Sequence, residues 1–158
     1  MSVPGLDQMG IADRIGALRL ESGRSELELA TELGFTVSGY CDLEQHDSEI
    51  ESVPSLAQVL KLAKLLGTDV LGLIGEAQPA TKLPIAKVRS ALAAHLGNSA
   101  EAREALEDLI DWDLGPFLDG NEEWVSVYTI EFIKKLAIAI EVDWQVILAG
   151  IGGAPQIP

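Results

Sequence analysis

The sequence predicts an all-α protein made of two tandem helical units, and three observations lead to this fold class. Small and apolar residues recur 74 residues apart along the chain, as Gly23 with Gly97 and Leu62 with Leu136. Within each repeat the apolar residues return at the three- and four-residue spacing of a buried helix face. No stretch of the repeat alternates polar and apolar residues as a half-buried strand does. A single offset held without a gap indicates a duplicated unit.

The first unit begins with two helices separated by a short turn. Apolar spacing predicts a helix from Ile11 that ends at Gly23, a residue suited to the left-handed conformation found after a helix. Ser25, followed three residues later by Glu28, has the sequence of a capping box and predicts a second helix that runs to Leu33. The glycine that follows, at position 34, makes the next turn.

Three further helices complete the first unit. Thr36 is expected to cap a helix over 37–44, in which Tyr40 and Leu43 face inward. The polar, acidic segment 45–53 shows no period and predicts a loop. Pro54 or Ser55 then begins a helix that ends at Gly67, and a short helix or turn spans 69–74.

The second unit is expected to repeat this order. Its predicted elements are helices over 84–96 and 99–109, a short segment over 113–118, a loop over 119–127, and helices over 129–140 and 143–149. The expected domain boundaries are 8–76 for the first unit, 77–83 for a linker, 84–151 for the second unit and 152–158 for a flexible tail.

Composition limits the classes of partner. The chain has 158 residues, 11 basic and 25 acidic, for a formal net charge of -14. This charge repels phosphate backbones and anionic membrane surfaces. The single cysteine, Cys41, excludes an intramolecular disulfide and is typical of a reducing compartment. Without a signal-peptide pattern or a long apolar run, we expect a cytoplasmic protein that does not bind membranes.

An ordered set of residues in the first unit resembles a known family. The set comprises Ser25, Leu29-Ala30, Leu33-Gly34, Tyr40, Leu43-Glu44, Pro54-Ser55-Leu56, Leu62-Ala63, Leu66-Gly67 and Leu73. Together, from about Ile11 to Gly75, these residues are similar to the Cro/CI-type (XRE-like) helix-turn-helix family. The resemblance implies a lambda-repressor-like bundle of about five helices with a recognition helix over 36–44. The second unit is a degenerate copy, inferred from the constant offset.

The positions that the resemblance places against DNA lack the side chains that DNA readers use. They are Thr36, Val37, Ser38 and Asp42, none of which offers a bidentate donor to guanine. No Lys or Arg lies between positions 25 and 60, against eight acids: Glu26, Glu28, Glu32, Asp42, Glu44, Asp47, Glu49 and Glu51. The corresponding stretch 101–131 has Arg103 alone against ten acids. Because phosphate neutralisation supplies non-specific DNA affinity, that affinity is expected to be absent.

Other candidate residues favour contact or packing over catalysis. Trp112 and Trp124 stand among acidic residues and either form a partner surface or fill a looser core. Glu44 is expected to form a local ion pair at the end of the recognition helix. His46 and His95 have no second ligand at a metal-like spacing. We therefore expect no enzyme activity, no cofactor, no metal and no small-molecule ligand.

Two functions remain open at this point. The first is a regulatory helix-turn-helix protein that acts through protein contacts, with its acidic motif faces bound to a partner or to a second copy of the chain. The alternative is a DNA-binding transcription regulator of the Cro/CI type that uses its tandem units as a pseudo-dimer on two half-sites. The charge distribution favours the first function.

Overall fold

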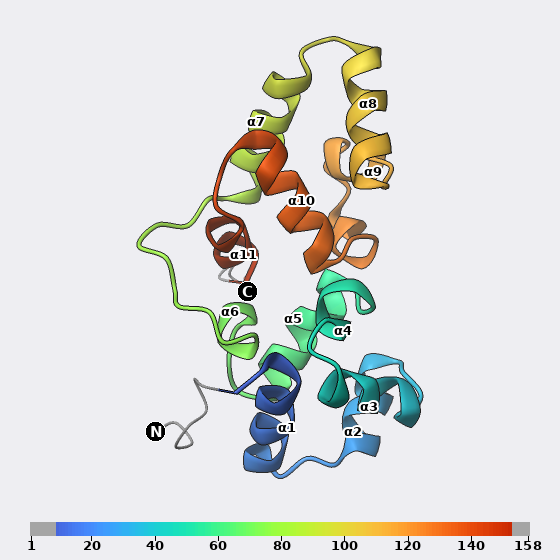
Figure 1. Cartoon of the computed structure of the whole chain (residues 1–158), viewed down its shortest axis with the longest axis vertical. Helices are drawn as coiled ribbons and strands as arrows, with labels where there is room; N and C mark the ends of the chain where they lie inside the picture. The colour runs from blue at the N-terminus through green and yellow to red at the C-terminus, as the bar shows by residue number, and fades with distance from the viewer. Residues whose placement is uncertain (1–8, 153–158) are drawn as a thin grey trace.

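The computed structural model describes residues 9–152, and in that range every regular element is a helix (Figure 1). The all-α prediction is therefore confirmed, while residue 8 and most of the predicted tail, 153–158, lie outside the described residues. The first half contains α1 (Ile11–Ser22), α2 (Glu26–Leu33), α3 (Val37–Gln45), α4 (Glu49–Ser52), α5 (Leu56–Leu65) and α6 (Val70–Leu73). The second half contains α7 (Ile85–Leu96), α8 (Ala100–Ile110), α9 (Gly115–Leu118), the 3-10 helix η2 (Glu122–Ser126), α10 (Ile130–Ile140) and α11 (Trp144–Gly152).

The order of the helices repeats with the offset seen in the sequence. The helices α1, α2, α5 and α6 each begin 74 residues before α7, α8, α10 and α11. Caps recur as well, since Ser25 and Ser99 accept the backbone N–H three residues later, and Ser55 and Thr129 do the same. The halves differ at the third helix, because α3 has nine residues and α9 has four.

The two segments predicted as loops contain short helices, so that prediction was wrong in both halves. Segment 45–53 includes α4, whose Ile50 is 0% exposed. Segment 119–127 includes η2, whose Trp124 is 7% exposed. A helix of one turn shows no hydrophobic period, and here a single buried side chain anchors each acidic segment. Long-range packing, which no local pattern records, decides these two elements.

The two halves pack against each other through reciprocal contacts. Helix α4 of the first half packs on α10, and its counterpart η2 packs on α5. Helix α6 packs on its own counterpart α11. The α4–α10 contact therefore has an equivalent, η2–α5, in which the two halves exchange places, and the α6–α11 contact is its own equivalent. This is the pattern that an approximate two-fold axis produces. Figure 1 shows the halves stacked along the long axis, with α6 and α11 meeting between them.

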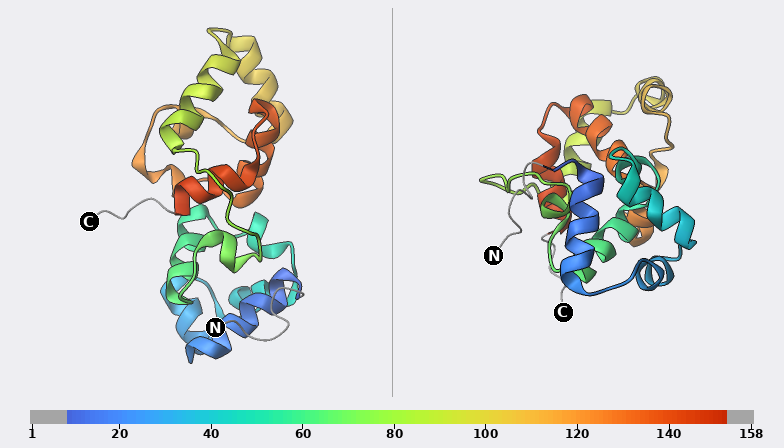
Figure 2. Two further views of the ribbon diagram at one scale, coloured as in Figure 1. Left: turned by 90° about the vertical axis from the view of Figure 1, so that its left-hand side faces the viewer. Right: turned by 60° about the horizontal axis from the view of Figure 1, so that its bottom comes forward.

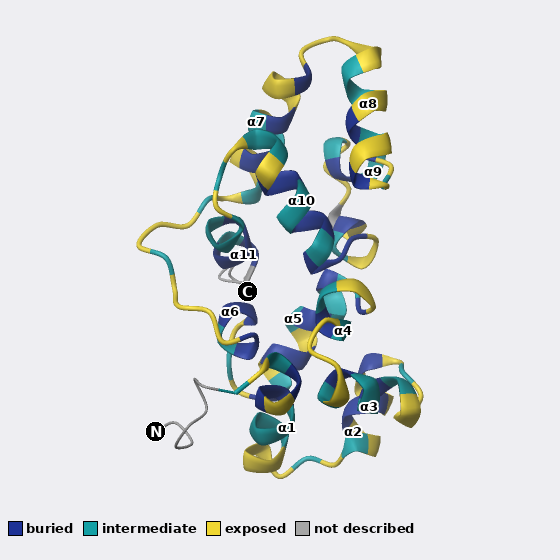
Figure 3. Ribbon diagram, viewed as in Figure 1, coloured by how far each residue is buried: buried dark blue, intermediate teal, exposed yellow. Residues whose placement is uncertain are grey.

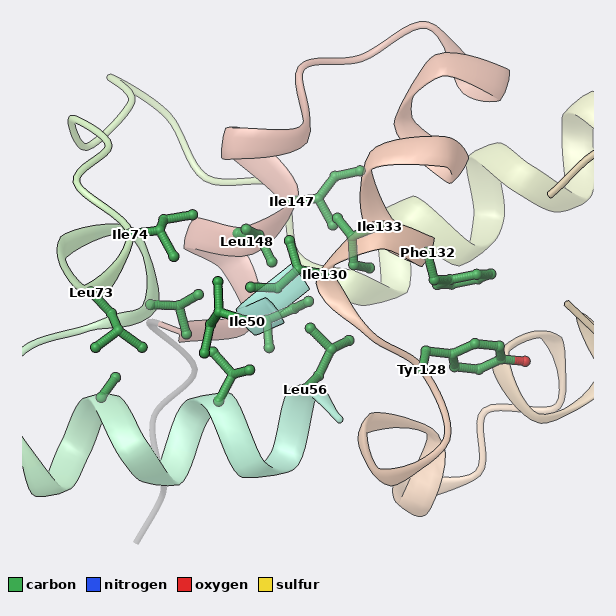
Figure 4. Packing of buried hydrophobic residues seen from close by; sticks show 14 of the residues in the cluster. Ile50, Leu56, Leu73, Ile74, Tyr128, Ile130, Phe132, Ile133, Ile147 and Leu148 are labelled. Atoms are coloured by element: carbon green, nitrogen blue, oxygen red, sulfur yellow. The ribbon is translucent and has the colours of Figure 1, made fainter. Parts of the chain in front are cut away.

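One hydrophobic core runs through both halves. Figure 4 shows Ile50 and Leu56 from the first half directed into the same junction as Ile130 and Leu148 from the second. The backbone N–H of Leu56 also donates to the carbonyl of Tyr128, at 2.8 Å, across the junction. The two halves therefore bury apolar side chains against each other, which neither half could do alone.

The linker between α6 and α7 is irregular, as the sequence predicted, and its end is attached to α11. The backbone N–H of Leu83 donates to the carbonyl of Val146 at 3.1 Å. A Cβ at Gly150 would collide with the carbonyl of Leu83, so this close approach requires glycine. Figure 3 shows the rest of the linker exposed on the side opposite α8 and α9.

The motif helices of both halves lie on one side of the molecule. In Figures 1 and 2, α2 and α3 of the first half and α8 and α9 of the second lie away from the linker. This side, which we call the motif face, is defined by these four helices. The two-fold arrangement thus places the corresponding helices of both halves on the same side of the molecule.

The buried anchor of α4 makes a direct prediction about stability. Replacing Ile50 by Ala removes buried methyl groups at the junction and should lower the free energy of unfolding by about 2–5 kcal/mol. The same substitution at Ile138, which is 78% exposed, should change it by less than about 0.5 kcal/mol. Urea denaturation of both variants is the measurement. Equal effects at the two positions would show that α4 is a surface loop.

Candidate interaction surfaces

The turn between α2 and α3 is built from local caps and one left-handed glycine. Ser25 accepts the N–H of Glu28 at 3.0 Å, and the Glu28 carboxylate accepts the N–H of Ser25 at 3.0 Å, which completes the predicted capping box. Gly34, with φ of 80°, ends α2. Thr36 then caps α3 by accepting the N–H of Gly39 at 3.0 Å. These contacts fix the angle at which α3 leaves α2.

The four predicted recognition positions lie together on the outer side of α3. Val37 and Ser38 are exposed in its first turn, and Asp42 is partly exposed one turn later. Thr36 is exposed too, but its hydroxyl is engaged in the cap of α3. The surface that α3 offers is therefore small, uncharged at its N-terminal end and acidic beyond it.

An ion pair behind this surface holds α3 on α1. The Arg19 guanidinium donates to both carboxylate oxygens of Glu44, at 2.7 and 3.2 Å, and both side chains are largely buried. This pairing raises the pKa of Arg19 further. Glu44 is thus paired, as predicted, but its partner lies on another helix. Gly16 allows the approach, because a Cβ there would lie 3.2 Å from a Glu44 carboxylate oxygen.

Helices α2 and α3 contain no basic residue, and cations that reach them from other helices are paired with their carboxylates. Arg24 donates to the carbonyl of Leu65 at 3.2 Å, and Lys61 lies 3.7 Å from the Glu32 carboxylate. In contrast, Glu28 and Glu32 of α2 are exposed. The half of the motif face made by α2 and α3 therefore carries acids without a free cation of its own.

The second half repeats this acidity on α8. Its exposed side carries Glu101, Glu104 and Asp108. Arg103, the lone base of the segment, lies 3.2 Å from Glu107 and 3.6 Å from Asp113. A hydrogen bond from the Gly115 backbone, with a contribution from Arg103, holds the pKa of Asp113 below its ordinary value. Arg103 is consequently committed to carboxylates of its own chain.

The two tryptophans singled out by the sequence take different places. Trp124 is buried and packs edge-on against Phe117, with ring centroids 5.2 Å apart, so it fills the core and offers no partner surface. Trp112 is partly exposed, with its ring edge against Phe132 at 5.6 Å and the Lys135 ammonium 5.9 Å from its centroid. Of the two tryptophans, only Trp112 remains a candidate both for a partner surface and for packing in the core.

The described residues show neither a metal cluster nor an activated thiol. Among residues 9–152 no group of three or more His, Cys, Asp or Glu side chains is arranged to hold a metal ion. Partial burial and the Glu26 carboxylate, 3.4 Å from the sulfur, raise the pKa of the Cys41 thiol and so reduce its reactivity. No helix in the described range is long and apolar enough to cross a membrane.

Comparison with protein-family models, curated proteins and solved structures found no match to this chain. Its function must therefore be inferred from the motif face and the junction of the two halves. Sequence reasoning had identified the first of these surfaces. It had missed the junction of the two halves, because the only sequence feature of α4 and η2 is that they lie in acidic segments at equivalent positions of the repeat.

Two buried tyrosines should respond in opposite ways to the loss of the hydroxyl. The hydroxyl of Tyr40 is buried without a hydrogen-bond partner in the described structure, whereas that of Tyr128 donates to the Asp113 carbonyl at 2.6 Å and accepts the Phe117 N–H at 3.2 Å. Tyr128→Phe should destabilise the fold by about 1–3 kcal/mol, and Tyr40→Phe should be neutral or stabilising. Chemical denaturation at neutral pH compares them directly, and a larger loss for Tyr40→Phe would contradict the assignment.

The same variants have a pH readout. Burial, reinforced by the nearby Glu44 carboxylate, raises the pKa of Tyr40 well above its ordinary value of 10.0. Above pH 10 the unfolded chain loses a proton that folded Tyr40 keeps, so stability should fall as the pH rises. Tyr40→Phe should flatten this alkaline decline.

Proposed function

We propose that this chain is a Cro/CI-type helix-turn-helix regulatory protein that acts through protein contacts in place of DNA binding. In this proposal residues 8–76 and 84–151 form two tandem lambda-repressor-like bundles, the second of them degenerate. Support for the class comes from the capped α2–turn–α3 unit, the ion pair that holds α3 on α1, and the offset shared by four pairs of helices. The proposed protein is cytoplasmic and has no catalytic role.

The observation that carries the proposed mode of action is the charge of the motif face. Its four helices contain one base, Arg103, which is bound by two carboxylates. A protein that neutralises no phosphates has no non-specific DNA affinity from which specific binding can be built. The same acidity attracts a basic protein surface and accelerates its association at low salt. A protein partner with a basic surface therefore fits the motif face better than DNA does.

The alternative is DNA binding by the two halves together. One observation favours it: the approximate two-fold axis and the common side occupied by α3 and α9 match the symmetry of a two-half-site operator. Against it, α9 has four residues, Gly115–Leu118, and supplies no polar side chain to a base edge. The two-fold arrangement of the halves does not supply the hydrogen-bond donors that base recognition needs.

A DNA titration separates the two functions. The wild-type chain and a Glu26→Gln/Asp42→Lys variant are titrated with random-sequence duplex at about 50 and 200 mM salt, by fluorescence anisotropy. We expect no wild-type binding at either salt, because the motif face repels phosphates. The variant should gain weak, salt-sensitive binding, because the scaffold is intact and one cation has been added. A pool of selected sequences tests specific recognition in the same assay.

Tight wild-type binding to a defined duplex, weakening steeply with salt, would overturn the proposal in favour of the alternative. A charge-neutral control variant, Ser38→Ala, keeps the acidity of α3 and should behave as the wild-type chain does. If that control gains affinity as the Lys variant does, charge is not the factor that excludes DNA.

A further inference from the structure

An open groove lies where the approximate two-fold axis leaves the junction between the halves. Its lining residues come from the end of α4 and the start of α5 in the first half, and from the end of η2 and the cap of α10 in the second: Val53, Ser55, Ala57, Gln58, Ser126, Val127 and Thr129. Two pairs of these residues, Val53 with Val127 and Ser55 with Thr129, are equivalents at the 74-residue offset. The groove, which we call the axial groove, is thus built by the repeat itself.

The polar residues of the axial groove are partly engaged within the chain. Ser55 accepts the N–H of Gln58 at 3.2 Å, and Thr129 accepts the N–H of Phe132 at 3.4 Å. The Gln58 amide donates to the Leu33 carbonyl at 2.9 Å and accepts the Ser55 N–H at 3.0 Å. Ser55 and Thr129 act only as acceptors in these caps, and the Gln58 amide is engaged through both its oxygen and its nitrogen. The groove therefore keeps side-chain hydroxyls, which can hydrogen-bond to an occupant or to water, beside its apolar residues.

Apolar and polar surface contribute equally to the lining of the axial groove. Val53 is 54% exposed and Val127 is 48% exposed, and they belong to the small set of large apolar side chains that the fold leaves in water. The small side chains of Ser55 and Ala57 also line the groove. An aliphatic side chain inserted here would contact both valines and gain burial on each side.

The charges around the axial groove identify the chemistry of the partner. Glu49 in α4 lies four residues before Val53, and its equivalent Glu123 in η2 lies four residues before Val127, so each acid is about one helical turn from its valine. The nearby cations are neutralised, since Lys134 lies 3.0 Å from Glu51 and Lys135 lies 3.9 Å from Glu131. A second copy of the chain would bring a groove and acids against the same features, so self-association through this face is opposed. A basic partner has complementary charge.

We propose that the axial groove docks the apolar face of a basic amphipathic helix from a partner protein, an inference that rests on the proposed function. Such a helix presents aliphatic side chains one turn apart with Lys and Arg on its flanks. Its aliphatic side chains lie between Val53 and Val127, and its flanks face the acids of the two halves. Because the axis passes through a single groove, one helix binds per chain.

The test uses three synthetic peptides of about four helical turns. One is amphipathic, built of Leu and Lys; the second has the same Lys positions with Ser in place of Leu; the third has Glu in place of Lys. Isothermal titration at about 100 mM salt gives affinity and stoichiometry. We expect the Leu/Lys peptide to bind one to one, at least about tenfold more tightly than the Ser/Lys peptide, and the Leu/Glu peptide not to bind.

A charge-matched pair of variants locates the site. Val53→Asp/Val127→Asp should weaken the Leu/Lys peptide at least about tenfold, although it adds acids that attract Lys, because the apolar contacts are lost. Leu20→Asp/Ile138→Asp adds the same charge at positions 71% and 78% exposed and should leave the affinity unchanged or slightly higher. Circular dichroism melts confirm that both variants fold, and Val53→Ser/Val127→Ser replaces the Asp pair if it does not.

The outcomes separate this inference from the proposed function. If the Lys peptides bind equally well, or the groove variants bind as the wild type does, or two peptides bind per chain, the axial groove is not the site while the proposed function stands. If no Lys peptide binds and duplex DNA does, the proposed function fails and the inference with it. Tighter binding of the Leu/Lys peptide, lost only in the groove variants, supports both.

Discussion

The reciprocal docking of α4 on α10 and of η2 on α5 is the interaction on which the rest of the structure depends. Each half is about 70 residues long, a size at which a single core is marginal. At the junction Ile50 is fully buried, and Glu51 pairs with Lys134, which also lies 4.5 Å from the centroid of the Trp144 ring. Because these contacts also set the two-fold relation, they place the motif helices of both halves on one side and form the axial groove at their edge.

Local chemistry explains which parts of this architecture the sequence could predict. Helix ends follow from capping residues and from glycines with positive φ, so Ser25, Gly34 and Ser55 placed their helices within a residue or two. The partner of Glu44 could not be predicted in this way, because Arg19 is distant in sequence. The signal was present in Gly16, one helical turn before Arg19, whose missing Cβ makes room for the carboxylate.

The structure of the acidic segments was harder to predict, because their composition is typical of a loop whereas each of them forms a short helix with a buried side chain. A segment such as 45–53 has the polarity of a loop, yet Asp47 caps α1 by accepting the N–H of Ala12 at 2.9 Å and Ile50 enters the core. Trp124 likewise follows two acids, Glu122 and Glu123, and it is buried against the aromatic rings of Phe117 and Tyr128. Where one residue in a segment decides its structure, the tertiary neighbours of that residue must be known first.

The way in which the two halves have diverged bears on function. The second half keeps the helices that meet the first half, α10 and α11, at the same offset, and α11 is even longer than α6. It lacks a third helix as long as α3, because α9 has four residues. There the chain is held by the Tyr128 hydroxyl, which binds the backbone at Asp113 and Phe117 on either side of the start of α9. A tandem protein that reads two DNA half-sites needs two recognition helices. A tandem protein whose second half supplies burial, a second acidic surface and a groove on the two-fold axis does not need a second recognition helix. The helices that the two halves share fit the proposed role in protein contacts.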